Sequence, residues 1–360
     1  MSRSRTLPIE ASEQGRPSPR PPLGGFAQRV IDWQGRHGRH DLPWQRSRNP
    51  YAVWISEIML QQTQVATVIP YYQRFLQRFP DVGALASASV DQVMQLWSGL
   101  GYYSRARNLH RAANEVAKEH AGVFPHDATS LGKLPGVGRS TAAAIAALAF
   151  GSRCAILDGN VKRVLCRYFA VAGDPSSSAV ERDLWALAER LVPQAQADVY
   201  TQGMMDIGAT VCLRQRPKCS LCPLAADCAA HRSGRVDRFP QRRQRAALPE
   251  REVAMFVLHH RAEVMLQKRP PHGIWGGLWS LPEADPEHDP VLVCESRFGA
   301  RAAEVRALPV VKHGFTHFRL RIRPWRIDVR TLAPRAAESG IMWLPLGEAR
   351  DAALPAPVRR

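Results

Sequence analysis

Apolar residues recur with the period of a helix from Phe26 to about Ala230. In the segment 52–67 (AVWISEIMLQQTQVAT), Trp54, Ile58 and Val65 fall near one helical face. The same spacing predicts further helices over 90–97, 106–120, 140–150, 161–168 and 180–192. Short runs with Gly, Pro or Asp separate these segments, so the pattern predicts a compact all-α unit.

A strand-like pattern replaces the helical one after Glu252. The runs 253–260 and 263–269 are close enough in sequence to form a β-hairpin. In the run 317–330 (HFRLRIRPWRIDVR), the apolar phase shifts at Pro324, which predicts an edge strand or a bulge. The chain should therefore carry a second, α+β domain over 252–350, followed by a tail over 351–360.

The two remaining segments are predicted to be a tail and a linker. Residues 1–24 contain Arg, Pro and Ser but no apolar stretch, which favours a disordered tail over a secretory signal. Glu10 and Glu13 also disfavour a transit peptide. Residues 231–251 hold seven arginines and predict a basic linker, either a solvated connector or a strap along a nucleic-acid backbone.

Charge and cysteine usage narrow the class of protein. A net charge of +17 favours a polyanionic partner, although charge alone does not separate DNA from RNA or an anionic membrane. No apolar run is long enough to span a bilayer, so a membrane protein is not expected. The seven cysteines are an odd number in a chain without an export signal, which argues for a reducing compartment and against a disulfide framework.

Four of the cysteines fall within one short segment, with the spacing Cys-x6-Cys-x2-Cys-x5-Cys. They are Cys212, Cys219, Cys222 and Cys228. Four thiolates so close in sequence can hold one tetrahedral metal ion or one iron–sulfur cluster. Structural zinc stays open on ligand number, but zinc ribbons usually pair two Cys-x2-Cys hooks and this segment has only one.

Three further motifs contain candidate catalytic or binding groups. The run 134–141 (LPGVGRST) can form a glycine hairpin whose amides bind phosphate, or an ordinary turn. Asp158 precedes a glycine, where a helix cap is the usual role. Glu57 lies between apolar residues and is either exposed or a carboxyl whose pKa is raised by desolvation.

Together these motifs resemble the MutY-type adenine DNA glycosylases of the endonuclease III, or helix-hairpin-helix, superfamily. The resemblance spans most of 26–350 and includes LPWQ (42–45), SEIMLQQTQV (56–65) and GLGYYSRAR (99–107). It implies a mainly α helix-hairpin-helix glycosylase domain over 25–230, with one [4Fe-4S] cluster on the four cysteines, and a Nudix-like α+β domain over 252–350. It also implies a monofunctional enzyme that hydrolyses the N-glycosidic bond of adenine mispaired with 8-oxoguanine or guanine.

The resemblance assigns the catalytic roles. Glu57 would be the general acid that protonates adenine, and Asp158 would stabilise the oxocarbenium-like sugar. Asn160 would orient Asp158 or the water. Relatives that also cut the strand carry a lysine where this chain has Ser140, so no Schiff base is expected.

The resemblance also assigns recognition residues. Those expected to contact adenine or DNA are Trp44, Gln61, Gln62, Tyr102, Gly136, Gly138 and Gln202. Tyr102 would intercalate, with ordinary core packing as its alternative, and Gln202 would pair with the adenine edge. Phe315, Thr316 and His317, in HGFTH (313–317), would inspect 8-oxoguanine, with Thr in place of the family's usual Ser.

The second domain resembles a Nudix fold from the run 269–283 (RPPHGIWGGLWSLPE). The acidic metal-binding box of Nudix pyrophosphatases is missing from 284–304, so this domain should bind without hydrolysing. The expected partner is mispaired duplex DNA, bound by a monomer with no membrane association. The expected location is the bacterial cytoplasm, or the nucleus or mitochondrion of a eukaryote.

Three other functions remain open from the residues alone. The first is an endonuclease III-like enzyme that removes oxidised pyrimidines and nicks DNA, which Ser140 and the second domain oppose. The second is a non-enzymatic DNA-binding protein with a metal-stabilised loop. The third is a Nudix pyrophosphatase fused to a binding domain, which the missing acidic box opposes.

Overall fold

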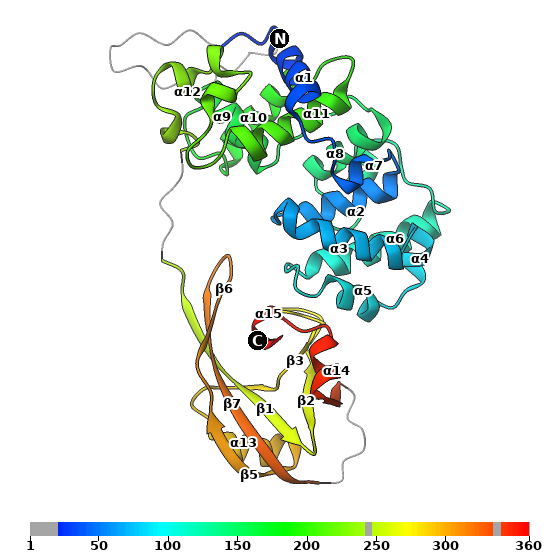
Figure 1. Ribbon diagram of the computed structural model, residues 1–360, viewed down its shortest axis with the longest axis vertical. Helices are drawn as coiled ribbons and strands as arrows, with labels where there is room; N and C mark the ends of the chain where they lie inside the picture. Colours follow the sequence, from blue (N-terminus) through cyan, green and yellow to red (C-terminus); the bar gives the residue numbers. More distant parts are fainter. Residues whose placement is uncertain (1–20, 242–246, 334–339, 360) are drawn as a thin grey trace. The chain divides into compact units, whose positions relative to one another are not determined.

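The computed structural model describes residues 21–241, 247–333 and 340–359, so most of the predicted tail over 1–24 lies outside the described residues. The chain divides into two compact units (Figure 1). The first consists of Met1–Ala86 with Arg111–Gln244, and the second of Ser87–His110 with Arg245–Arg360. By its contacts, the segment Ser87–His110 therefore groups with the carboxyl-terminal part of the chain.

The first unit is helical, as predicted. Its α-helices are α1 (Phe26–His37), α2 (Pro50–Leu60), α3 (Val65–Arg78), α4 (Val82–Ser87), α7 (Ala128–Leu131), α8 (Arg139–Phe150), α9 (Gly159–Tyr168), α10 (Ser178–Leu191), α11 (Ala197–Asp206) and α12 (Ala229–Arg232). Short helical turns complete it: η1 (Pro43–Gln45), η2 (Ile207–Val211), η3 (Cys219–Leu221), η4 (Ala225–Asp227) and η5 (Val236–Arg238). Helix α6 (Ser104–Glu119) continues from the second unit into the first.

The helical pattern over 52–67 is not one helix. Helix α2 ends at Leu60, Gln61 leaves the helical conformation with ψ of 111°, and Gln62 adopts a left-handed φ of 57°. Helix α3 begins only at Val65. The run 61–64 has no large apolar side chain, so burial does not favour continuing the helix through it. Val65 thus belongs to a different helix from Trp54 and Ile58.

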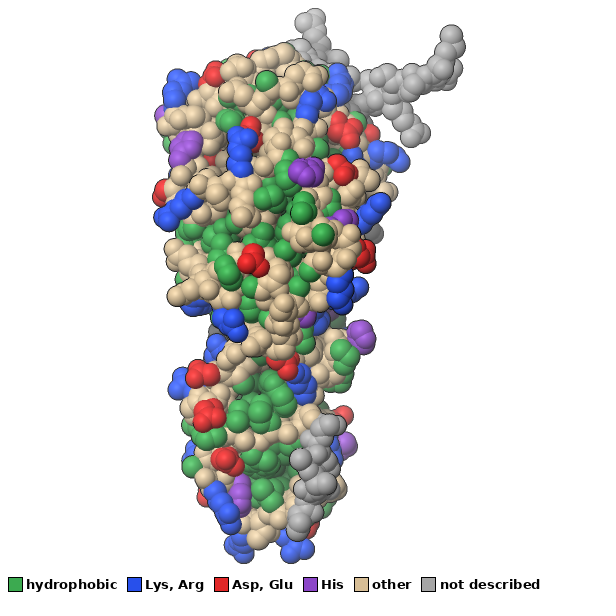
Figure 2. Space-filling model, turned by 90° about the vertical axis from the view of Figure 1, so that its right-hand side faces the viewer, with side chains coloured by type: hydrophobic (Ala, Val, Ile, Leu, Met, Phe, Trp, Pro, Cys, Tyr) green, Lys and Arg blue, Asp and Glu red, His purple; other side chains and the backbone are tan. Residues whose placement is uncertain are grey.

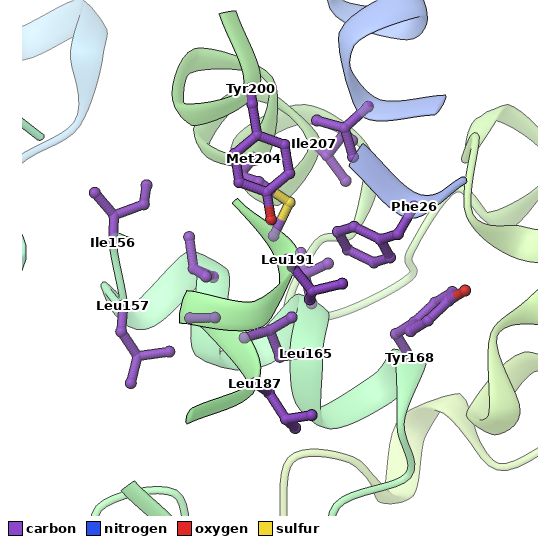
Figure 3. Packing of buried hydrophobic residues seen from close by; sticks show 14 of the residues in the cluster. Phe26, Ile156, Leu157, Leu165, Tyr168, Leu187, Leu191, Tyr200, Met204 and Ile207 are labelled. Carbon is purple, nitrogen blue, oxygen red and sulfur yellow. The ribbon is translucent and has the colours of Figure 1, made fainter. Parts of the chain in front are cut away.

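One core cluster fixes the amino-terminal end of α9. Phe26 of α1 extends toward residues of α9, α10 and α11 (Figure 3). Its ring meets that of Tyr168 edge-on, with the centroids 4.8 Å apart. Leu165 is fully buried in the same cluster. Val161 in the first turn of α9 and Tyr168 at its end both belong to this core, so the turn that carries Asp158 has little freedom to move.

Part of the predicted linker packs against the helical unit. Phe239 is 1% exposed and lies in a small cluster with Ala170, Ala229 and Ala230. Residues 242–246 lie outside the described part of the chain. The residues up to about Phe239 therefore extend the first unit instead of forming a free connector.

The second unit is built on a mixed sheet. Its strands are β1 (Glu250–His260), β2 (Glu263–Lys268), β3 (Trp279–Ser280), β4 (Glu283–Ala284), β5 (Ala300–Ala307), β6 (Val311–Gly314), β7 (Arg319–Leu332) and β8 (Ile341–Pro345). The path runs β3-β2-β1-β7-β5, with β1 and β7 parallel. Its helices are α5 (Val90–Trp97), α13 (Pro290–Phe298), α14 (Leu346–Asp351) and α15 (Ala356–Arg359). The predicted hairpin of β1 and β2 is confirmed.

Two predictions in this unit need correction. The phase shift at Pro324 marks neither an edge strand nor a bulge at that residue. Strand β7 pairs with β1 on one side and with β6 and β5 on the other, and the register shifts against β5 lie at residues 301–304. Pro324 lies where β7 passes from β6 to β5, so its missing N–H breaks no ladder bond there. The residues expected to form a tail over 351–360 include α15, and Leu354 packs with Val264 and Leu266 at 4% exposure.

Candidate active site

The Glu57 carboxyl lies on α2 among buried neighbours. Ile55 and Ile58 are fully or almost fully buried. Burial, together with the charge of Asp158 as the smaller cause, raises the pKa of Glu57 to about 8. The structure therefore favours a desolvated carboxyl over an exposed helix residue. Asp158 is distant in sequence, so the fold brings the two acids together.

Asp158 caps helix α9. Its Oδ1 accepts hydrogen bonds from the backbone N–H of Asn160 at 2.9 Å and of Val161 at 2.7 Å. The Asn160 amide donates to Oδ2 at 3.3 Å. Burial raises the pKa of Asp158, whereas these hydrogen bonds oppose the rise because they favour the carboxylate. For Glu57, by contrast, both causes favour the neutral acid. The helix-cap role and a catalytic role are therefore compatible.

Asn160 is held from its other side by Arg163. The guanidinium donates from Nη2 to Asn160 Oδ1 at 2.9 Å and from Nε to the carbonyl of Cys212 at 2.7 Å. A Cβ at Gly208 would lie 2.5 Å from the Asn160 Cβ, so only glycine permits this approach. The amide orientation of Asn160 is fixed by these partners.

Ser140 contacts the backbone beside Asp158. Its Oγ accepts a hydrogen bond from the Leu157 N–H at 2.9 Å. The residue thus joins the first turn of α8 to the turn that carries the acid. A hydroxyl there cannot form a Schiff base.

The turn between α2 and α3 lies beside the start of α8. Gln61 donates from Nε2 to the Thr141 hydroxyl at 3.3 Å. Gly136 has a left-handed φ of 80°, which the hairpin requires, and Gly138 is the residue before α8 begins. The structure therefore brings Gln61 close to the predicted helix-hairpin-helix element.

Trp44 and Gln202 line one pocket of about 350 Å³. The other lining residues are Gln34, His40, Gln45, Ser47, Arg48, Val53, Ser56, Leu148, Asp198 and Val199. Trp44 packs edge-on against Tyr72, with ring centroids 5.4 Å apart. Glu57 and Asp158 are not among the lining residues, although Val53 and Ser56 belong to the helix that carries Glu57. Two predicted recognition residues thus share one pocket, and Glu57 lies on the helix that supplies two other lining residues, Val53 and Ser56.

A buried ion pair behind this pocket was not predicted from the sequence. Asp206 is fully buried and pairs with the Arg39 guanidinium at 2.6 Å. Gln202 donates from Nε2 to Asp206 Oδ1 at 2.9 Å. The contact between Gln202 and Asp206 could have been predicted from the sequence, because residues four apart lie on the same face of a helix.

The four clustered cysteines line one small pocket together with Arg167. Burial raises the pKa of Cys222 to about 12 and of Cys228 to about 11, and the neighbouring cysteines contribute to both shifts. Arg167 donates to the Cys212 sulfur at 3.3 Å. Among residues 21–241, 247–333 and 340–359, no three His, Cys, Asp or Glu side chains are arranged to hold a single metal ion.

Within the second unit, Tyr102 is 48% exposed, which contradicts core packing. Its backbone has a left-handed φ of 48°, and Arg105 lies over its ring at 5.5 Å. The Tyr102 and Thr316 hydroxyls are 3.5 Å apart. Phe315 stacks on Phe318, with centroids 4.4 Å apart. The predicted intercalating and inspecting residues therefore meet in one unit.

Surface charge and hydropathy add two observations. On the face drawn in Figure 2, Lys and Arg side chains are spread over much of the surface and do not form a single patch. In the part of the chain that the structure describes, no helix is long and apolar enough to cross a membrane.

Both halves of the chain match known families. Residues 55–190 match the HhH-GPD superfamily of base excision DNA repair proteins, and residues 253–360 match the Nudix domain. The adenine DNA glycosylase of Buchnera aphidicola subsp. Baizongia pistaciae is 35% identical over 336 residues, which cover 93% of this chain and 95% of the relative. The adenine DNA glycosylase of Homo sapiens is 36% identical over 398 residues, which cover 93% of this chain and 73% of the relative.

Solved structures share the helical fold. A thermostable thymine-DNA glycosylase superposes with a TM-score of 0.54 at 29% identity and covers 58% of this chain and 96% of its own. A trapped covalent intermediate of endonuclease III with DNA gives a TM-score of 0.50 at 23% identity, with 58% and 94% coverage.

Proposed function

Because the chain belongs to the adenine DNA glycosylase family of base excision repair enzymes, we propose that it excises adenine mispaired with 8-oxoguanine or guanine in duplex DNA. The observation that supports this proposal is a pair of carboxyls, one in surroundings that favour the protonated acid and one with hydrogen bonds that favour the carboxylate. Glu57 is a buried acid with a pKa of about 8, and Asp158 is hydrogen-bonded at a helix amino terminus. Hydrolysis of an N-glycosidic bond needs one proton donor and one anion.

Glu57 supplies the proton. Adenine is a poor leaving group unless it is protonated, and a carboxyl with a pKa near 8 is mainly in its acid form at neutral pH. After the base is extruded from the duplex, Glu57 donates to adenine N7 and becomes a carboxylate. The carboxylate can then accept a proton from the water that attacks the sugar.

Asp158 stabilises the positive charge that develops on the sugar. Three donors hold its carboxylate, two of them backbone N–H groups at the start of α9. An acid fixed in this way needs no rearrangement when charge appears, which is the basis of electrostatic catalysis. Asn160 acts by keeping Asp158 in position. Since Ser140 has no amine, the products are free adenine and an intact abasic strand.

We infer that the four clustered cysteines hold one [4Fe-4S] cluster. The four thiols line one pocket and are partly buried, and burial disfavours thiolates unless a cation neutralises them. The segment has one Cys-x2-Cys hook, whereas zinc ribbons usually pair two, so the spacing favours the cluster over a single zinc ion. The cluster would stabilise the fold of this loop; the chemistry above uses only protein side chains.

The second unit carries recognition of the opposite base in this proposal. Tyr102 enters the base stack and Phe315, Thr316 and His317 contact 8-oxoguanine, while Trp44 and Gln202 contact the extruded adenine. Gln61, Gln62, Gly136 and Gly138 contact the DNA beside it. The Nudix-like domain binds without hydrolysing, and the enzyme acts as a monomer on the mispair.

The test is single-turnover adenine release from A·8-oxoguanine and A·G duplexes. Glu57→Gln and Asp158→Asn should each abolish release while duplex binding is retained, and Glu119→Gln, an exposed control on α6, should match the parent. Borohydride should trap no covalent complex with the parent. Release by either variant at the parental rate, or efficient trapping, would overturn the proposed mechanism.

A further inference from the structure

We propose that Asp206 is a positioning residue for base identity: it holds the Gln202 amide so that the amide oxygen faces the pocket and accepts a hydrogen bond from the exocyclic amino group of adenine. The inference rests on the proposed function, since it concerns how that site distinguishes adenine from other purines.

The amide of Gln202 has only one compatible orientation. Its partner, Asp206 Oδ1, lies 2.9 Å from Nε2. An ion-paired carboxylate accepts hydrogen bonds and cannot donate them, so the NH₂ end of the amide must face Asp206. The oxygen is then directed away from Asp206. Gln202 lines the pocket with Trp44, and the oxygen is therefore the polar atom that it offers there.

Asp206 is itself fixed from several sides. Arg39 donates to it from the backbone N–H at 2.9 Å and from Nε at 2.7 Å. Gln45 in turn donates to the Arg39 carbonyl at 2.9 Å. Since the carboxylate is fully buried, removal of either charge would leave the other unpaired, so the pair is strongly constrained.

Helix α11 is also held in place, so the amide has little freedom through its backbone. A Cβ at Gly203 would lie 2.7 Å from the Val30 side chain, which shows how closely α11 approaches α1. The orientation of the Gln202 amide is thus left to its hydrogen bond with Asp206.

An acceptor at this point selects adenine chemically. Adenine carries an amino donor at C6, whereas hypoxanthine and guanine carry an oxygen acceptor there and unsubstituted purine carries neither. The Gln202 oxygen would accept a hydrogen bond from adenine and would repel the oxygen of hypoxanthine or guanine. With unsubstituted purine, that hydrogen bond would be absent. A lost hydrogen bond changes a rate by roughly tenfold.

A second pair in the chain provides a matched control. Gln28 donates to Asp32 at 2.8 Å with the same four-residue spacing on α1, but this pair is exposed. A Gln–Asp pair at this spacing can simply stabilise a helix. Asp32→Asn should therefore leave base discrimination unchanged, while Asp206→Asn should alter it.

The experiment measures single-turnover release of adenine, purine and hypoxanthine placed opposite 8-oxoguanine. In Asp206→Asn the amide of Gln202 can turn over, so the preference for adenine over hypoxanthine should fall about tenfold or more relative to the parent. In a Gln202→Leu background, Asp206→Asn should cause no further change in that ratio. In the parent background, Asp206→Glu keeps the carboxylate and should retain the parental ratio. If Asp206→Asn fails to fold, Arg39→Gln with Asp206→Asn removes both charges together and makes the same comparison.

A uniform loss of rate on all three bases, or a fall in the ratio that persists without Gln202, would overturn the inference. So would a parental ratio in folded Asp206→Asn. These outcomes are separate from failure of the proposed function, which would appear as absent adenine release by the parent enzyme.

Discussion

The buried carboxyl of Glu57 should impose a pH-dependent cost on the folded protein. A carboxyl pKa raised from 4.5 to about 8 means that the folded protein binds this proton more tightly than the unfolded chain does. The cost is absent below the unfolded pKa of 4.5, grows as pH rises, and is complete once pH passes about 8. Glu57→Gln removes the charge and should abolish this pH dependence.

The magnitude follows from the pKa. A group with a pKa raised from 4.5 to about 8 costs about 5 kcal/mol at high pH. Between pH 5 and pH 8 the change is about 3–4 kcal/mol, because the unfolded carboxyl is already largely ionised at pH 5. Because Glu57 is not entirely shielded from solvent, the loss of stability between pH 5 and pH 8 is expected to be roughly 2–4 kcal/mol.

The assay is urea unfolding followed by far-ultraviolet circular dichroism, for the parent and Glu57→Gln at both pH values. The variant should gain roughly 2–4 kcal/mol relative to the parent between pH 5 and pH 8. Glu119→Gln, on the exposed end of α6, should track the parent. Titration of Glu57 followed by carbon-13 NMR gives its pKa directly. Asp158→Asn should lower this pKa, because the charge of Asp158 is one of the two causes that raise it. Parallel stability of the parent and Glu57→Gln across this range would refute the desolvated acid.

Three further outcomes are expected. Gly208→Ala forces a Cβ to 2.5 Å from Asn160, so single-turnover adenine release should fall about tenfold while duplex binding persists; an unchanged rate would contradict the close contact. Cys222→Ser should lower the iron content of the purified protein, measured by mass spectrometry, and its melting temperature, and full iron content would exclude this thiol as a ligand. Tyr102→Ala should weaken binding to a mispaired duplex by about 1–3 kcal/mol, measured by fluorescence anisotropy, whereas parental affinity would rule out stacking.

Local patterns in the sequence were sufficient for much of the fold. The helix Val90–Trp97 and the hairpin of β1 and β2 were predicted because periodicity and turn residues act over short distances. The four-cysteine spacing and the motif around Asp158 also lie within short segments. Such features can be recognised from neighbouring residues alone.

Only the tertiary structure decided the environment of each group. It buried Glu57 beside Asp158, ended α2 at Leu60 in spite of the continuing helical pattern, and made β7 an interior strand. It also paired Arg39 with Asp206 behind Gln202. Desolvation, ion pairing and strand partners depend on residues far apart in the chain, and a one-dimensional pattern does not say which of them will meet. The sequence therefore determined which chemical groups this protein has, and packing determined their protonation and orientation.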